Sequence, residues 1–499
     1  MNWDAAIPLL VVASSLLPGL VIFTLAEERV TLRTFLNLAG AVIKLGLVVW
    51  MIWGVYHQHH YEIRLALLPH LDLVLRAGPL ALLFVTLSSL LWLVTTVYAV
   101  GYLEGSPHRS RFFGFFSLCV TSTVGVALAG NLITFLLFYE LLTLSTYPLV
   151  VHRGTEEARR AGRSYLVYTM FGGGLLLLAT VWLYTLTGTL EFTPQGFVQQ
   201  VMATHRPALI VIFALFIAGL GVKAALVPLH GWLPKAMVAP APVSALLHAV
   251  AVVKAGAFGI VRIVYDVFGV EAAAHLGVIN PLAWLAAFTI LYGSVRALSQ
   301  NDLKRRLAFS TVSQVSYITL GVAIIGPIAS IGGIVHLVHQ GLMKITLFFC
   351  AGNLAETLGI HKISEMHGVG RRMPWTMTAF TIGAFGMIGA PPVAGFVSKW
   401  YLGLGALQAG QGWVVIVLAL SSLLNAMYFL PILHAAWFRA PPAQWPAEHN
   451  FGHKETAWAL LLPPVITAVI AVAVGLLASA PFSPLDWARL IAQREFYRP

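Results

Sequence analysis

The sequence predicts an all-α polytopic membrane protein, and three observations lead to this prediction. Hydrophobic residues occupy 59% of the 499 positions and charged residues only 10%, whereas a soluble domain has about 25% charged residues. The mean hydropathy is +0.83. Apolar runs recur from end to end, for example at 5–25, 78–103 and 457–480. Each reaches the roughly 20 residues that a helix needs to cross about 30 Å of hydrocarbon. Barrel strands would instead alternate over about ten residues.

The apolar runs divide into fourteen expected transmembrane helices, which we number in chain order. They cover residues 5–25, 35–56, 78–103, 111–130, 132–152, 164–188, 207–228, 243–268, 277–298, 306–325, 328–352, 373–395, 412–438 and 457–480. No Lys or Arg precedes the first run, and Glu27 and Glu28 follow it. These are not the flanks of a cleaved signal peptide, so we expect this run to remain as helix 1.

The net charge of +11 could indicate a nucleic-acid partner, but the basic residues lie in short loops between apolar runs. We therefore expect no nucleic acid. With both termini outside, the outer side holds six basic residues and six others lie within the spans. The remaining eighteen of the 30 face the cytoplasm, as the positive-inside rule requires. We expect a multi-pass protein of the plasma membrane. The six outer basic residues are Arg64, Arg76, Arg206, Arg489, Arg494 and Arg498.

The six basic residues within or at the edge of the spans are Lys44, Lys223, Lys254, Arg262, Lys344 and Lys399, and Glu140 joins them in helix 5. A charge at the bilayer centre costs about 2.5–3.5 kcal/mol and is usually functional. Arg262 is near the end of helix 8, where its side chain can snorkel to the surface. For Lys44 the functional and structural interpretations both remain open. Glu140 has no local partner, so we expect it to be protonated or paired with a lysine of another helix.

Two of these lysines flank interruptions in their helices. Lys223 precedes the segment VPLHGWLP at 227–234, and Lys399 follows GAPPVAGFVS at 389–398. Proline removes a helix hydrogen bond, and non-helical backbone at membrane depth is tolerated only where it lines protein or water. Broken helices in corresponding positions are typical of transporters built from repeats. The spacing of five helices predicts two inverted repeats, with helices 7 and 12 broken.

The repeats would divide the chain into four segments. They are 1–110 with helices 1–3, 111–268 with helices 4–8, 277–438 with helices 9–13, and 457–480 with helix 14.

Helix 11 has a polar stripe. His336, Gln340 and Lys344 are spaced by four residues and share one helix face, whereas His339 lies about 100° away from Gln340. In helix 8, His248 and Lys254 lie about 240° apart on a straight helix. They should therefore contact different neighbours rather than each other.

Histidine, lysine and glutamate suit proton transfer. Histidine titrates near neutral pH, and burial brings the other two into range. The sequence has no phosphate-binding loop, dinucleotide fingerprint or cysteine ligand set, so we expect no cofactor and no metal. Cys119 and Cys350 lie inside apolar runs, as inert core residues do. These features indicate proton conduction along a buried relay without a redox site.

Four segments resemble the antiporter-like proton-conducting subunits of respiratory complex I, group 4 membrane-bound hydrogenases and Mrp-type cation/proton antiporters. They are FYEL at 138–141, GVKAALVPLHGWLP at 221–234, APVSALLHA at 241–249 and DLKRRLAFSTVSQ at 302–314. The resemblance covers roughly residues 75–440, with the motifs in the order of the family. It implies fourteen helices with two inverted five-helix repeats. The segment VAVVKAGAFG at 250–259 most resembles the D subunit of Mrp antiporters.

The resemblance also implies residue roles. Glu140 and Lys223 would form the ion pair that gates proton uptake, Lys254 would be the central lysine with His248 beside it, and Lys399 would be the terminal lysine. In helix 11, His336 and Lys344 would belong to the relay, with His339 nearby. The sequence departs from many relatives at Gln340, where they have a second histidine, and at Ala77, where an acid is common.

Three functions follow from the resemblance. The first is a proton-translocating subunit of a multisubunit Na⁺/proton antiporter of Mrp type. The second is a proton-pumping membrane subunit of a complex I-like NADH:quinone oxidoreductase or a hydrogenase. The third is a subunit for proton-coupled uptake of inorganic carbon. Each requires other membrane subunits as partners. The relay residues do not separate the first two functions, because both use the same relay. Neighbouring genes would: small hydrophobic antiporter subunits indicate the first function, and iron–sulfur or quinone-site subunits indicate the second.

Overall fold

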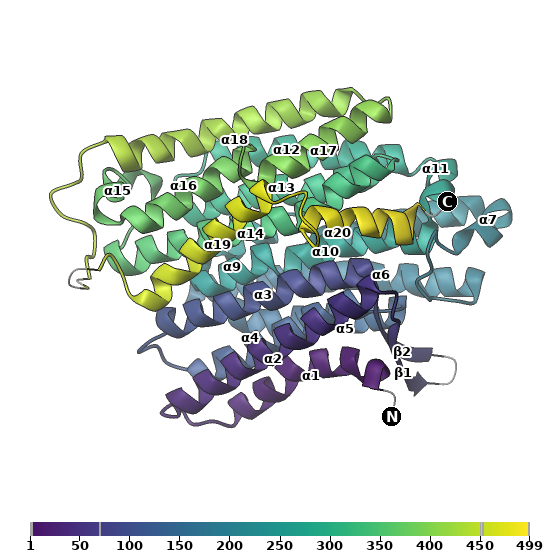
Figure 1. Ribbon diagram of the computed structural model, residues 1–499, viewed down its shortest axis with the longest axis horizontal. Helices are drawn as coiled ribbons and strands as arrows, with labels where there is room; N and C mark the ends of the chain where they lie inside the picture. The colour runs from purple at the N-terminus through teal and green to yellow at the C-terminus, as the bar shows by residue number, and fades with distance from the viewer. Residues whose placement is uncertain (1–2, 69–70, 450, 452–453, 498–499) are drawn as a thin grey trace.

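The computed structural model describes residues 3–68, 71–449, 451 and 454–497. Long helices run roughly parallel to one another and a short hairpin lies at one end of the molecule (Figure 1). Arg498, counted in the charge bias, lies outside the described residues. The long helices are α1 (Trp3–Phe23), α2 (Val30–Tyr56), α3 (Pro79–Tyr102), α4 (Arg109–Leu128), α5 (Leu132–Val150), α6 (Glu156–Thr187), α7 (Met202–Lys223), α9 (Ala241–Ala249), α10 (Val252–Arg262), α12 (Ile279–Leu298), α13 (Leu303–Ala323), α14 (Pro327–Leu358), α16 (Pro374–Ile388), α17 (Ala394–Gln408), α18 (Trp413–Phe438) and α19 (Trp458–Leu476).

All fourteen expected spans contain helix, which confirms the predicted fold class. Twelve helical segments of the described chain are long and apolar enough to cross a membrane. The other two expected spans are α13, which is rich in Ser, Thr and Gln, and the broken pair α16 and α17, each 15 residues long. The inverted relation of the two repeats stays a prediction.

Both expected helix breaks are present. α7 ends at Lys223, and the chain continues through turns to the one-turn helix α8 (Trp232–Lys235). α16 ends at Ile388, and α17 begins at Ala394. A third break was not predicted. Val250 (φ −124°, ψ −50°) and Ala251 (φ −104°, ψ −91°) separate α9 from α10. Helix 8 is therefore not straight, and the expected angle of 240° between His248 and Lys254 is wrong.

The β-hairpin is the other feature that sequence reasoning missed. Strands β1 (Tyr61–Leu68) and β2 (Leu71–Ala77) are antiparallel, with Tyr61 opposite Ala77. The start of α1, the short helix α11 (Val270–Leu276) and the C-terminal helix α20 (Pro484–Ile491) lie at the same end of the molecule (Figure 1). We call this end the hairpin face.

The core and the periphery differ in burial. The most apolar stretches of α14 and of the 241–268 segment are 100% buried, so these helices form the centre of the helix bundle. α14 packs against α9, α13, α16, α17 and α19. Large apolar side chains such as Trp50, Val167 and Phe288 are exposed on outer helices, as expected where a helix faces lipid. The central position of α14 and of α9–α10 is what brings the predicted relay residues inside the protein.

Candidate functional site

Lys223 ends α7 and points toward α5. The side chain is buried, its Nζ donates to the carbonyl oxygen of Tyr139, and Nζ lies 3.4 Å from the centroid of the Tyr139 ring. Glu140 is the next residue, and its Oε1 is buried without a hydrogen-bond partner among the described residues. Lys223 therefore lies beside Glu140 but bonds to the main chain before it. Glu140 and Lys223 do not form an ion pair among the described residues, and the gating role of this pair stays a prediction.

The carboxylate of Glu140 occupies space that a glycine of α6 leaves free. A Cβ atom at Gly173 would lie 2.3 Å from Oε1 and 2.7 Å from Cδ of Glu140, closer than real Cβ contacts allow. The neighbouring Gly174 has nothing within 4 Å of an added Cβ. The lack of a side chain at Gly173 therefore determines where the carboxylate of Glu140 can lie.

The two predicted relay residues of helix 8 lie on opposite sides of its break and both contact α14. His248, on α9, stacks on Phe348 with ring centroids 4.4 Å apart, and neither of its ring nitrogens has a partner in the described part of the chain. Lys254, on α10, donates from Nζ to the carbonyl oxygen of Leu337 at 2.8 Å. Because both residues are fully buried, α14 is their common neighbour.

Helix α14 carries the predicted stripe, fully buried along its length. Nδ1 of His336 lies 2.8 Å from the hydroxyl of Ser398 on α17, and Nζ of Lys344 donates to the carbonyl oxygen of Leu307 at 3.1 Å. The polar side-chain atoms of His339 and Gln340 have no hydrogen-bond partner within the described residues. The stripe therefore contacts α17 at one end and α13 at the other.

Lys399 lies at the second break, as predicted. Its Nζ donates to the carbonyl oxygens of Met387 and Ile388 and to the hydroxyl of Ser422, each at 2.9 Å. The last carbonyl groups of a helix have no intrahelical partner. The end of α16 therefore provides the oxygens that hold this ammonium group inside the protein.

Sequence reasoning missed the side chains that surround His336 and Lys399. The ring of Tyr317 on α13 stacks on His336 at 5.1 Å between centroids, and Nζ of Lys399 lies 5.4 Å from the same ring. Gln314 is one turn away on α13, and its amide has no partner among the described residues. Buried polar groups are nearly always paired with protein or ordered water, so this cluster is suited to hold water. The spacing of Gln314 and Tyr317 by three residues was the available signal.

We call Lys223, Lys254, Lys344 and Lys399 the lysine line. Two other intramembrane cations, Lys44 and Arg262, lie outside it. Lys44 is fully buried, and its Nζ donates to the hydroxyl of Ser15 at 2.6 Å and lies 5.0 Å from the centroid of the Trp92 ring. Arg262 does not snorkel to the surface. It is buried and donates from a terminal nitrogen to Asp266 at 2.5 Å, one helical turn later. Asp266 was also missed, although its i, i+4 spacing from Arg262 was readable in the sequence.

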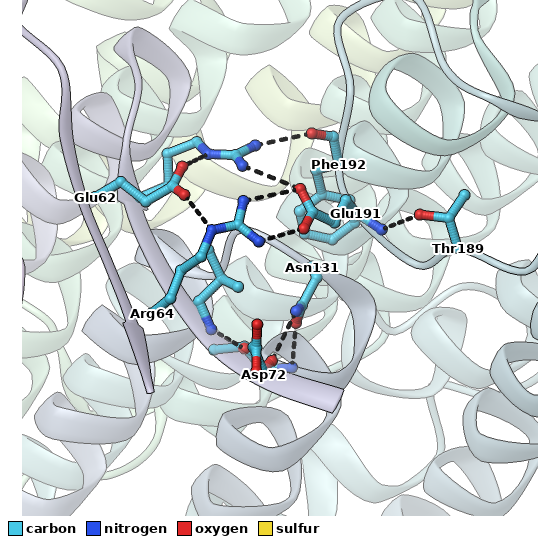
Figure 2. Close-up of polar contacts among 10 residues, drawn as sticks. Glu62, Arg64, Asp72, Asn131, Thr189, Glu191 and Phe192 are labelled. Carbon is cyan, nitrogen blue, oxygen red and sulfur yellow. Dashed lines mark hydrogen bonds and ion pairs between the residues drawn. The ribbon is translucent and has the colours of Figure 1, made fainter. Parts of the chain in front are cut away.

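Four paired charges attach the hairpin to the rest of the protein (Figure 2). Glu62 accepts from Nε of Arg64 at 2.6 Å and from Nε of Arg76 at 2.5 Å, and Glu191 accepts from both arginines. The hydrogen bond from Arg64, aided by the charge of both arginines, holds the pKa of the Glu191 carboxyl below its usual range. Burial opposes this shift only in part.

No group of three His, Cys, Asp or Glu residues in the described chain gathers closely enough to hold a metal ion. The site consists instead of four buried lysines, of which Lys254, Lys344 and Lys223 bond to a main-chain carbonyl. Lys399 bonds to two carbonyls and a hydroxyl. Main-chain and histidine contacts join helix 8 to α14 and α14 to α17.

Residues 129–425 match the family described as NADH:quinone oxidoreductase/Mrp antiporter, TM. This chain belongs to that family. The matched region contains Glu140, all four lysines of the line and both helix breaks.

Three members or assemblies illustrate the similarity. The chain is 38% identical over 368 residues to the N subunit of the NADH-quinone oxidoreductase of Desulforudis audaxviator, covering 73% of this chain and 72% of that protein. It is 28% identical over 484 residues to the D subunit of the Na⁺/H⁺ antiporter of Bacillus subtilis, covering 95% and 94%. Its structure matches a chain of the Mrp complex from Dietzia sp. DQ12-45-1b with a TM-score of 0.86 and 25% identity, covering 99% and 98%. The similarity to the Bacillus antiporter protein therefore extends over nearly the whole of both chains.

Proposed function

We propose that this chain is a proton-translocating subunit of a multisubunit Mrp-type antiporter that exchanges protons for a monovalent cation such as Na⁺. The observation that carries the proposal is the way its buried lysines are held. Among the described residues, Lys223, Lys254, Lys344 and Lys399 all bond to carbonyl oxygens and none to a carboxylate. A neutral carbonyl stabilises an ammonium ion less than a carboxylate does, so each lysine can release and recover a proton without breaking an ion pair.

The order of the groups supports lateral proton transfer. Lys223 lies at the α5–α7 contact, Lys254 bonds to α14, and His336 of α14 contacts the residue before Lys399. We propose that protons pass between these groups through water and hydroxyl groups, and that Glu140 sets the charge of Lys223 at the beginning of the line. His248, His339 and Lys344 would belong to the same hydrated interior.

The full-length similarity to the antiporter protein of Bacillus subtilis and to the Mrp complex supports an assembly with other membrane subunits. The exposed apolar surface of the outer helices is available for such partners or for lipid. The second candidate is a subunit of a complex I-like oxidoreductase, which the 38% identity to the oxidoreductase protein of Desulforudis audaxviator favours. Purification from native membranes separates the two: small hydrophobic antiporter subunits support the first, and iron–sulfur or quinone-site subunits support the second.

We also propose that the protein lies in the plasma membrane with the hairpin face outside. The start of α1 and the end of the described chain lie on this face (Figure 1), and most basic loop residues belong to the opposite one. Labelling of single cysteines with a membrane-impermeant reagent in intact cells tests the orientation. Labelling of Ala274→Cys, exposed on α11, but not of Arg153→Cys, exposed between α5 and α6, is expected, and the reverse pattern would overturn the proposed orientation.

Replacing Lys254 by methionine tests the function directly. Lys254 is fully buried and central, so Lys254→Met should lower cation-dependent dissipation of a pH gradient in vesicles by at least about tenfold, which corresponds to about 1.4 kcal/mol. The matched control is Lys235→Met, which removes an exposed lysine beside the first break. Protein abundance and assembly are measured in parallel. Transport at the wild-type rate in an assembled Lys254→Met complex would refute the proposal.

A further inference from the structure

A charged cavity of about 750 Å³ opens at the hairpin face. The hairpin, the start of α3, the α4–α5 turn, the segment 192–194 and the end of helix 8 surround it, and residues 493–495 close it from the C-terminal side. His59 and His60 are exposed and line it. Charged side chains such as Glu62 and Arg76 form part of its lining, and exposed residues connect it to the hairpin face.

Part of the cavity wall belongs to the charge cluster that joins the hairpin to Glu191, whose contacts are drawn in Figure 2. Arg76 bonds to Glu62, to Glu191 and, through a terminal nitrogen, to the carbonyl oxygen of Phe192 at 2.9 Å. Glu62, Arg76 and Phe192 all line the cavity. These contacts therefore fix the hairpin against residues 191 and 192 at the wall of the cavity.

The innermost charged groups of the cavity are Arg262 and Asp266. Both line it, and both are buried, with side chains 10% and 5% exposed. Arg262 lies between the rings of Phe192 and Phe258, 5.2 Å from each centroid. Asp266 lies in a π-helical turn, Ile263–Phe268, that ends helix 8. The pair thus lies where the cavity meets the helix that carries Lys254.

The same helix connects this pair to the lysine line. Lys254 and Arg262 belong to α10 and are eight residues apart, which corresponds to about 12 Å along a helix. A few water molecules span such a distance. Asp266 is the only acid that α10 and its π-helical turn contain, so it is the group there that can take up a proton and become neutral.

We propose that this cavity is the outer mouth of the proton line and that Asp266 is the group that exchanges protons between water in the cavity and the interior. The proposal rests on the proposed function and locates the outer end of the proton path. A proton from hydronium in the cavity binds the carboxylate of Asp266, which becomes neutral and releases Arg262. The proton then leaves for a water molecule on the side of Lys254, and the ion pair closes again. Arg262 keeps its charge throughout.

Other charged and titratable groups lie on the elements around Asp266, and their titration also contributes to the pH profile of transport. They are Arg262 on its own helix, Glu62 and Arg76 on the hairpin, His59 and His60 before it, Tyr265 in the π-helical turn, Glu271 and His275 on the adjoining α11, and Arg494 and Glu495 near the C-terminus. Only Asp266 among them is an acid of the helix segment that carries Lys254.

Thiol labelling tests the cavity. Pro194 lines the cavity and is exposed, and a proline has no backbone N–H to lose, so Pro194→Cys removes no hydrogen-bond donor. The native Cys119 and Cys350 are buried. A bulky cationic methanethiosulfonate added at the hairpin face should lower transport by at least fivefold, and a methyl-sized reagent should have a smaller effect. Ala274→Cys, exposed on α11 of the same face, is the control and should be labelled without effect. Failure to label Pro194→Cys, or labelling without inhibition, overturns the proposal.

Substitution of the acid tests its role. Asp266→Asn should lower transport at least fivefold in the assembled complex, and Asp266→Glu should retain a titratable group and most of the activity, with a displaced pH profile. A merely structural role predicts that Asn and Glu variants with normal abundance transport alike with the wild-type pH profile, and that result overturns the proposal. If Lys254→Met transports normally, the proposed function fails. If only the Pro194 and Asp266 experiments fail, the path along the buried lysines is intact and its mouth lies elsewhere.

Discussion

Nδ1 of His336 lies 2.8 Å from the hydroxyl of Ser398, and this contact joins the central helix α14 to the residue that precedes Lys399. A serine hydroxyl both donates and accepts hydrogen bonds, so it can relay a proton between an imidazole and a neighbouring ammonium group. The hydroxyl therefore gives His336 a polar partner on α17, the helix that also carries Lys399.

We expect Ser398→Ala to lower proton transport by about tenfold, because the hydroxyl bridge between His336 and the vicinity of Lys399 is lost; a tenfold change needs only about 1.4 kcal/mol. The control is Ser316→Ala on α13, a buried serine whose hydroxyl bonds back to Val312 of its own helix at 3.0 Å. Transport is measured in vesicles at matched protein abundance. Equal activity of the two variants would show that Ser398 is not part of the path.

Gly173→Ala should impair transport while leaving assembly intact. The added Cβ would lie 2.3 Å from Oε1 of Glu140, so the carboxylate must move away, whereas alanine itself favours a helix over glycine by about 1 kcal/mol. Gly174→Ala meets nothing within 4 Å and should transport normally. If both variants match the wild type, the position of the Glu140 carboxylate does not matter.

Glu140→Gln should reduce transport by at least about tenfold, and Glu140→Asp should keep part of the activity because its charge remains. Lys223→Ala should abolish exchange in an assembled complex, since its ammonium group is the cation that lies beside Glu140. The measurement is pH-gradient dissipation in vesicles on addition of the cation, with protein levels checked by immunoblot. Normal transport by Glu140→Gln at wild-type abundance would exclude the gating role of this pair.

Lys399→Ala should impair transport, and Lys399→Glu should retain more activity than alanine because it restores a titratable group at the second break. The two carbonyl oxygens that accept from Lys399 would bond to a protonated glutamic acid or to water instead. Transport rates of the two variants in vesicles make the comparison. Identical rates for alanine and glutamate would mean that titration at this position is not used.

Arg64→Gln should loosen the hairpin and reduce its sensitivity to acid. The pKa of the Glu191 carboxyl is lowered in the folded protein. The Glu191 carboxylate therefore stabilises the hairpin fully at any pH above the usual glutamate pKa of about 4.3. This contribution is lost as the pH falls through the lower pKa of the folded state. A spin label at the exposed Leu67 reports hairpin mobility between pH 7 and 3. Arg160→Gln, which removes an exposed pair with Glu156, is the control and should match the wild-type profile.

The transmembrane architecture could be predicted from the sequence because it depends on local properties. A run of apolar residues must form a helix in lipid, since only a helix pairs all its own backbone groups. The two breaks beside Lys223 and Lys399 were predictable for the same reason. Pro228 and Pro391 disrupt a helix locally, whatever the tertiary contacts. By contrast, the hairpin at 61–77 has alternation too weak to be distinguished from a loop, and its ionic partner Glu191 lies far away in the chain.

What the sequence by itself determined is where the long apolar helices lie, where helices 7 and 12 break and that the lysines of the apolar spans are buried. The tertiary structure decided which atoms these groups contact. The break at Val250 and Ala251 has no proline and became visible only in the folded chain. Lys254 meets Leu337, His336 meets Ser398 and Lys399 meets the end of α16. The physical reason is that a helix forms from contacts within four residues, whereas a buried ammonium group bonds to whichever distant carbonyl the packing of the helices brings within hydrogen-bond distance.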